Sequence, residues 1–156
     1  MKKGILIGAV VLMVAVIAGV TVYWNLPDTR AGRVLNKAMA HMTAMNYVEA
    51  KEAFEEVLEI DETSIRAYRG LADDYLAQGL QSEAEQILRK GYEATGDQVL
   101  LQNYNATVLN YAVKEINGQA TGWQTVERIL ALLEEQPGNE DAQKLLTACA
   151  PWMLGQ

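Results

Sequence analysis

The sequence is poor in the residues that carry most side-chain chemistry, since it holds one cysteine, Cys149, and one histidine, His41. A single cysteine excludes an intramolecular disulfide and a thiolate metal site, and a single histidine argues against a histidine metal cluster. The sequence also lacks a phosphate-binding glycine loop and a nucleotide-binding glycine fingerprint. We therefore expect no enzymatic activity, no metal and no cofactor. For Cys149 the sequence favours a small buried residue, with an intermolecular disulfide or a reactive thiol as alternatives.

Charge is missing altogether from residues 4–26. That stretch is long enough to cross a bilayer, which takes about 20 apolar residues. It exceeds the roughly 7–15 apolar residues of a signal peptide, and no small-x-small cleavage site stands near its end. We therefore predict a permanent transmembrane helix within an anchor segment, residues 1–27, that embeds the chain in a membrane.

The flanks of this stretch predict its orientation. Lys2 and Lys3 precede it, and Tyr23 and Trp24 close it. Basic residues tend to stay cytoplasmic, and tyrosine and tryptophan favour the membrane interface. The predicted topology has the N-terminus in the cytoplasm and the domain on the far side. The inverse topology stays open, because arginines at positions 30 and 33 follow the exit.

Small residues recur along the anchor at helical spacing, namely Gly4, Gly8, Ala15 and Gly19. Small residues let the backbones of two membrane helices approach closely. These positions therefore suggest helix–helix contact in the membrane, although glycine and alanine are common in such helices in any case.

Positive charge is scarce in the remainder of the chain. Residues 31–156 carry 10 Lys or Arg against 19 Asp or Glu, a net charge of −9. An acidic domain repels phosphate backbones and anionic lipid headgroups, so nucleic acid is excluded as a partner and the domain is expected to stand off the membrane.

What the sequence does contain is a self-similarity at a spacing of about 34 residues, a length typical of stacked helix-turn-helix units. The matched pairs are Val34 with Tyr68, Ala38 with Ala72, Ala50 with Ala84, Phe54 with Leu88 and Leu58 with Tyr92. Units of this kind build an extended surface that binds other proteins.

The apolar periodicity places the helices of these units. In the first unit one helix begins near Val34 and its partner spans about 47–60. In the second, one helix ends at Gly79 and Ser82 starts the next, with Glu85 completing a capping box. The third has a long helix from Leu100, a loop over 117–122 and a helix from residue 123. A last helix starts near residue 139, and the apolar residues 151–154 either fold back on the third unit or form a docking tail.

These residues resemble the tetratricopeptide repeat family. That family has large, small and aromatic residues at fixed places, held here by Tyr68, Leu71, Ala72, Tyr75, Gly79, Ala84, Leu88 and Gly91. The first unit departs from the pattern at Lys37, His41 and Glu62, and the third carries an insertion between its helices. The resemblance implies an all-α fold, in which residues 28–156 form a short helical solenoid of about three helix pairs plus a capping helix.

In this family the first helix of each repeat lines a concave, partner-binding face. Transferred by motif position, that face comprises Leu35, Met39, Arg66, Arg69, Asp73, Asn103, Thr107 and Asn110, with Tyr111 beside them. Arg66 and Arg69 are cations in an acidic domain, which suggests that they bind a carboxylate of a partner segment. The alternative is that Arg69 pairs with Asp73 one turn along the same helix.

The layout resembles bacterial single-pass inner-membrane proteins with a periplasmic repeat domain. That resemblance implies an adaptor, or scaffold, that mediates protein–protein interaction in the assembly of envelope or membrane complexes. It places residues 1–27 in the inner membrane and residues 28–156 in the periplasm, with membrane or periplasmic proteins as partners. The alternative is a permanent accessory subunit of a larger membrane complex, docked through both its transmembrane helix and its repeat domain.

Overall fold

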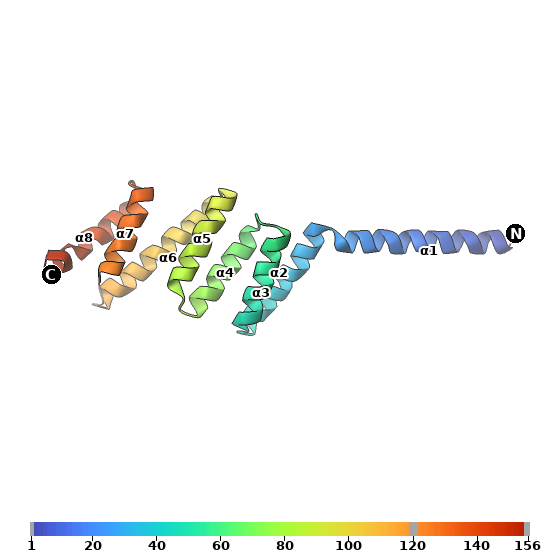
Figure 1. Cartoon of the computed structure of the whole chain (residues 1–156), viewed down its shortest axis with the longest axis horizontal. Coiled ribbons are helices and arrows are strands. Elements are labelled where there is room, and N and C mark those ends of the chain that lie inside the picture. The colour runs from blue at the N-terminus through green and yellow to red at the C-terminus, as the bar shows by residue number, and fades with distance from the viewer. Residues whose placement is uncertain (1, 119–121, 155–156) are drawn as a thin grey trace. The chain divides into compact units, whose positions relative to one another are not determined.

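The computed structural model describes the backbone of residues 2–118 and 122–154, with side chains from Leu12 onward except Asn25. These residues form eight α-helices and no strand (Figure 1). The helices are α1 (Lys2–Asn25), α2 (Pro27–Thr43), α3 (Tyr47–Ile60), α4 (Ile65–Ala77), α5 (Gln81–Thr95), α6 (Gln98–Asn117), α7 (Trp123–Glu135) and α8 (Glu140–Leu154). The expectation of an all-α chain is confirmed.

The apolar stretch at the N-terminus forms α1. In the part of the chain with described side chains, no single helix has the length and hydropathy needed to span a bilayer. One bent pair, Leu12–Trp24 with Pro27–Thr43, meets that requirement jointly, and its two segments meet at 61°. Ala15 and Gly19 lie exposed on α1, and a Cβ placed on Gly19 would meet nothing within 4 Å. Gly4 and Gly8 precede Leu12, so their surroundings lie outside the part of the structure that is described.

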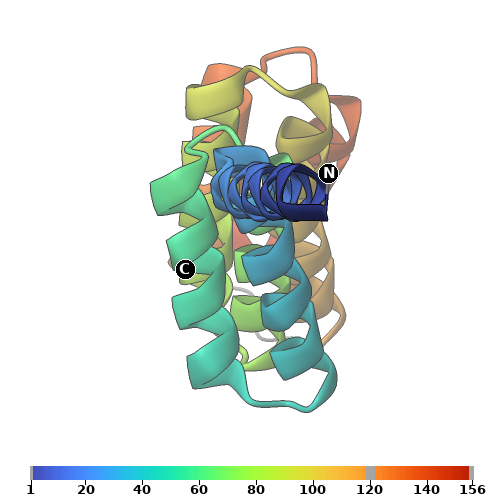
Figure 2. The ribbon, with the colours of Figure 1, turned by 90° about the vertical axis from the view of Figure 1, so that its right-hand side faces the viewer.

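The chain divides into two compact units, Met1–Ala67 and Tyr68–Gln156. In the first unit α2 and α3 lie side by side, joined by a short turn (Figure 2). Their facing apolar residues form its core, namely Leu35, Ala38, Ala50, Ala53, Phe54 and Val57. The domain boundary predicted between residues 27 and 28 rests on a change of composition, and it falls inside this first unit. It stays a prediction.

A structured elbow joins α1 to α2. The Thr29 hydroxyl donates to the carbonyl oxygens of Tyr23 and Leu26, both at 2.8 Å. Arg33 donates to the carbonyl oxygen of Trp24 at 2.7 Å, and its guanidinium lies 4.8 Å from the Trp24 ring centroid. The carbonyls of Tyr23 and Leu26 also accept the backbone amides of Leu26 and Arg30, so the side-chain contacts reinforce backbone hydrogen bonds at the elbow. Helix α2 begins at Pro27, ahead of the start expected near Val34.

The second unit is built from α4 (from Tyr68 on) through α8. Gly91 of α5 faces Tyr68, and a Cβ added there would lie 2.6 Å from Tyr68 Cγ and 3.0 Å from Leu100 Cδ1. The small residue thus lets the helices pack closely, as the resemblance implies. Further along, α6 packs on both α7 and α8, and Cys149 is buried in α8 as expected.

The C-terminal residues continue α8 through Pro151 to Leu154. The Trp152 ring packs edge-on against Trp123 at the start of α7, with centroids 5.2 Å apart. Of the two alternatives for residues 151–154, the contact of Trp152 supports folding back on the third repeat. Leu154 itself remains exposed.

The turn inside each of the first two repeats contains a residue with a left-handed backbone. Met45 has φ of 58°, and Gly79, at the corresponding place of the second repeat, has φ of 76°. A side chain is strained in that conformation, whereas glycine adopts it freely. The repetition seen in the sequence therefore extends to backbone geometry, with an unfavourable residue in the first turn.

We expect Met45→Gly to stabilise the protein by about 1 kcal/mol, because it removes the cost of a left-handed non-glycine residue. The Met45 side chain is 72% exposed, so little packing is lost. The measurement is urea unfolding of the full chain in detergent. Gly79→Met is the matched control and should destabilise by a similar amount; a loss of stability in Met45→Gly would contradict the argument.

Candidate functional site

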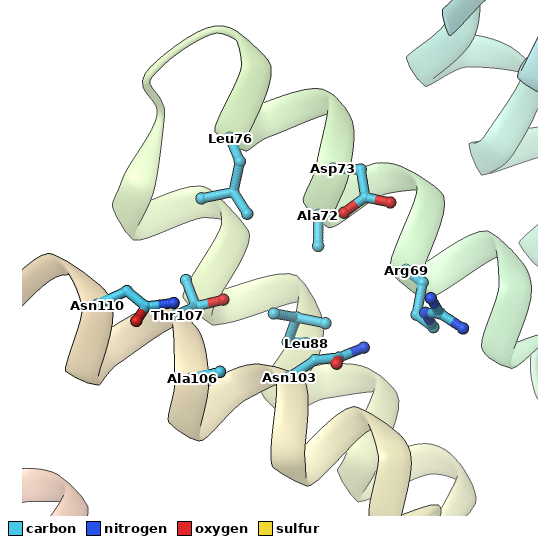
Figure 3. A pocket seen from close by; sticks show the side chains of 9 residues that line it. All are labelled: Arg69, Ala72, Asp73, Leu76, Leu88, Asn103, Ala106, Thr107 and Asn110. Atoms are coloured by element: carbon cyan, nitrogen blue, oxygen red, sulfur yellow. The ribbon is translucent and has the colours of Figure 1, made fainter.

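A cavity of about 170 Å³ lies in the second unit between α4, α5 and α6, and we call it the groove pocket (Figure 3). Its polar lining consists of Arg69, Asp73, Asn103, Thr107 and Asn110. Its apolar lining consists of Ala72, Leu76, Leu88 and Ala106. The groove pocket thus combines an apolar floor with a rim that carries both signs of charge and two amides.

The polar lining contains five of the nine residues that motif position selected. Asn103, Thr107 and Asn110 follow one another at helical spacing along α6, and Figure 3 shows Asn103 and Asn110 at opposite ends of that wall. The apolar lining was not among the selected residues. Leu88 is one of the family's fixed positions and is buried, whereas Leu76 is exposed and is not part of the family pattern named above. Leu76 lies one helical turn beyond Ala72, and this spacing is the only sequence signal that could have indicated that it lines the pocket.

The other selected residues are placed differently. Leu35 is buried in the core between α2 and α3, so its side chain is absent from the surface expected for it. Leu35 was assigned to the concave face by its motif position, but the helix that carries it departs from the family pattern. Met39 and Arg66 are exposed in the first unit. Tyr111 lies in the second unit, half-buried beside the pocket rather than lining it.

Arg69 and Asp73 do not pair with each other. Among the described residues no ion pair joins them within 4.0 Å, and Figure 3 shows their charged ends apart. Burial raises the pKa of the Asp73 carboxyl, and the Arg69 charge lowers it by a smaller amount. The pairing expected from the four-residue spacing is therefore absent. Both charges are available to a ligand.

Behind α6, a set of polar side chains joins α5, α6 and α7. We call it the α5–α7 network; its members are Gln81, Ser82, Glu85, Tyr111 and Arg128. Arg128 donates to the Ser82 hydroxyl at 2.8 Å and lies 3.5 Å from a Glu85 carboxylate oxygen. Gln81 donates to the Thr107 carbonyl oxygen at 3.0 Å. The network therefore reaches the wall of the groove pocket from its far side.

The expected capping box at the start of α5 is wrong. Leu80 is the N-cap of α5 and supplies no side-chain cap. The Ser82 hydroxyl accepts from Arg128 instead, a partner on α7. Local spacing could not reveal that partner.

Tyr111 is occupied by two neighbours. The Arg128 guanidinium lies 4.5 Å from the centroid of its ring. A hydrogen bond with Glu115 raises the pKa of the Tyr111 hydroxyl. One face of its ring is therefore covered by a cation of the same chain.

Within residues 12–118 and 122–154 no group of three His, Cys, Asp or Glu side chains has the geometry to hold a metal ion. What the site offers is shape, hydrogen-bonding groups and two opposite charges.

Comparison with protein families finds a match to the tetratricopeptide repeat model over residues 41–103. The matched stretch runs from the end of α2 to the first residues of α6, and it includes Arg69, Asp73 and Asn103 of the groove pocket. Comparison with curated proteins finds no match.

Proposed function

Because residues 41–103 match the tetratricopeptide repeat model, we propose that the chain is a protein-interaction adaptor whose groove pocket holds a segment of a partner protein. Repeats of this family typically bind other proteins. The observation that carries the proposal is that Arg69 and Asp73, which do not pair with each other, stand on the rim of a pocket with an apolar floor.

The size and lining of the groove pocket suit a protein segment. At about 170 Å³ it is smaller than the roughly 300–1,000 Å³ of a small-molecule site, so it takes a single protruding side chain more readily than a cofactor. Asn103 and Asn110 each offer amide donors and a carbonyl acceptor, which match the two polar groups of a peptide bond. Arg69 suits a carboxylate of the segment, with charge-assisted hydrogen bonds.

We further propose that α1 anchors the chain in a membrane. All large apolar side chains from Leu12 to Val22 that the structure describes are about half exposed or more. A helix that is apolar all round suits either a protein core or a bilayer. The uncharged residues 4–26 and the basic Lys2 and Lys3 favour an inner-membrane span with a cytoplasmic N-terminus, which leaves residues 28–156 in the periplasm.

A second candidate is a permanent accessory subunit of a larger membrane complex. The elbow favours it, because Thr29 and Arg33 of α2 each donate a hydrogen bond to a carbonyl at the end of α1. An anchor tied to the first repeat would carry that repeat at a fixed place in an assembly. A flexible linker would suit capture of passing clients better.

The proposal is tested by purifying the full chain from solubilised native membranes and identifying the co-purifying proteins. We expect Arg69→Glu to reduce capture about tenfold or more, because a charged hydrogen bond contributes about 1.5–3 kcal/mol and reversal adds repulsion. Lys114→Glu is the control of equal charge change, since Lys114 does not line the groove pocket. Undiminished capture by the arginine variant would refute the groove as the binding site.

The same purification separates the two candidates. A stoichiometric complex that survives mild detergent supports the accessory subunit. Capture that depends on the client and weakens with salt supports the adaptor, because exposed charge interactions are screened.

A further inference from the structure

Arg128 of α7 lies outside the groove pocket but makes the least exposed ion pair of the described residues. The side chains of Arg128 and Glu85 are 19% and 13% exposed, whereas every other ion pair has both partners at least 34% exposed. Arg128 Nη2 also donates to Ser82 Oγ at 2.8 Å. Helix α7 is thereby tied to the first turn and a half of α5.

From Glu85 the connection runs on to the groove pocket. Gln81 Nε2 lies 3.1 Å from Glu85 Oε1 and 3.0 Å from the carbonyl oxygen of Thr107. Thr107 stands between Asn103 and Asn110 on the α6 wall of the pocket. A continuous chain of polar contacts therefore runs from Arg128 through Glu85 and Gln81 to Thr107.

Arg128 also reaches α6 directly. Its guanidinium lies 4.5 Å from the centroid of the Tyr111 ring, at the distance of a cation–π interaction. Tyr111 follows Thr107 by about one helical turn. Arg128 therefore contacts α6 at one point directly and at a second through Glu85 and Gln81.

This arrangement is unfavourable for stability alone. A cation beside the N-terminus of α5 opposes the helix dipole. Arg128 Nη1 is buried, and among the described residues it has no hydrogen-bond partner. A buried ion pair is also weak evidence of net stabilisation, because desolvation offsets its attraction.

We infer that Arg128 is a positioning residue for the α6 wall of the groove pocket. Through Glu85 and Gln81, and through Tyr111, it fixes the stretch 103–110 that presents Asn103, Thr107 and Asn110. The functional sense of this inference rests on the proposed role of the pocket. Its structural content can be measured on the chain without a partner.

The test is residue-resolved hydrogen exchange on the full chain in detergent. We expect Arg128→Met to speed amide exchange over 103–110 about tenfold or more, with little change over 84–95 of α5. Arg128→Lys should restore much of the protection, because it keeps the cation over Tyr111 and near Glu85. Gln81→Met breaks the last contact and should reproduce the effect even where Arg128→Met fails to fold.

Arg89→Met is the matched control, because Arg89 also joins α5 to α7, through Glu135, and its ion pairs involve neither Gln81 nor Thr107. It should leave exchange over 103–110 unchanged. Uniform acceleration throughout 68–154 in Gln81→Met, or an equal effect in Arg89→Met, would overturn the inference. Neither result would bear on partner capture, so the proposed function is judged separately.

Discussion

Gly91→Ala should destabilise the second unit by about 2 kcal/mol or more, although it adds only one methyl group, because overpacking is costly in a closely packed interface. The added Cβ would lie 2.6 Å from Tyr68 Cγ and 3.0 Å from both Tyr68 Cβ and Leu100 Cδ1. Overpacking of this kind costs about 1–3 kcal/mol, and occasionally more. Tyr68 Cβ is fixed by the backbone, and Tyr68 Cγ can move only if the buried ring rotates about Cα–Cβ, which places the cost at the upper end. Alanine regains about 1 kcal/mol of helix propensity, which is too little to offset it.

Urea unfolding of the full chain in detergent, followed by circular dichroism, measures this difference. Gly32→Ala is the control, because Gly32 lies in α2 and an added Cβ there meets nothing within 4 Å. That variant should be more stable than the parent by roughly 0.5–1 kcal/mol, from helix propensity alone. If the two variants shift stability in the same direction, close helix packing at Gly91 is not what the glycine provides.

The sequence predicted those helices best whose signals are local. The span from Tyr47 to Ile60 agrees with α3 at both ends, because apolar periodicity and the flanking turn residues mark it. The start of α2 was missed, since residues 27–33 carry no apolar stripe. Pro27 in the first turn is a helix-start signal that could have corrected it. Asp97 caps the start of α6, where its side chain accepts from two backbone amides.

The candidate site was predicted in part, because its residues too follow from a sequence pattern. Motif position brought Arg69, Asp73, Asn103, Thr107 and Asn110 together, because the repeat fixes which face each helix presents. It could not show what each side chain contacts. The four-residue spacing suggested a pair between Arg69 and Asp73, yet spacing does not fix side-chain direction.

Contacts between distant residues were beyond reach from one sequence. Arg128 lies on a different helix from both Tyr111 and Glu85, and the insertion between α6 and α7 breaks the repeat spacing that would relate them. The polar network behind the pocket therefore emerges only from the fold. In the sequence, Glu85 and Arg128 look like ordinary surface charges, and Ser82 looks like a helix cap.

Phe54→Ala should destabilise the protein by about 3–5 kcal/mol, the largest effect that we expect from one substitution. The Phe54 side chain is fully buried between α2 and α3, and its removal forfeits the burial of a ring and leaves a cavity. The first unit has few other large core side chains to close that space, since Ala38, Ala50 and Ala53 make up much of its core. Thermal unfolding of the full chain in detergent provides the measurement.

Phe54→Leu tests whether this site requires an aromatic ring or only a large apolar side chain. Leu88 occupies the corresponding place of the second repeat and is 2% exposed, so a leucine is compatible with the repeat geometry. Leucine fills more of the space of the ring than alanine does, so it leaves a smaller cavity and costs less. Phe54→Leu should therefore recover most of the stability lost in Phe54→Ala. Equal losses in the two variants would mean that the first repeat depends on the aromatic ring itself, and that the correspondence between the two repeats does not extend to their cores.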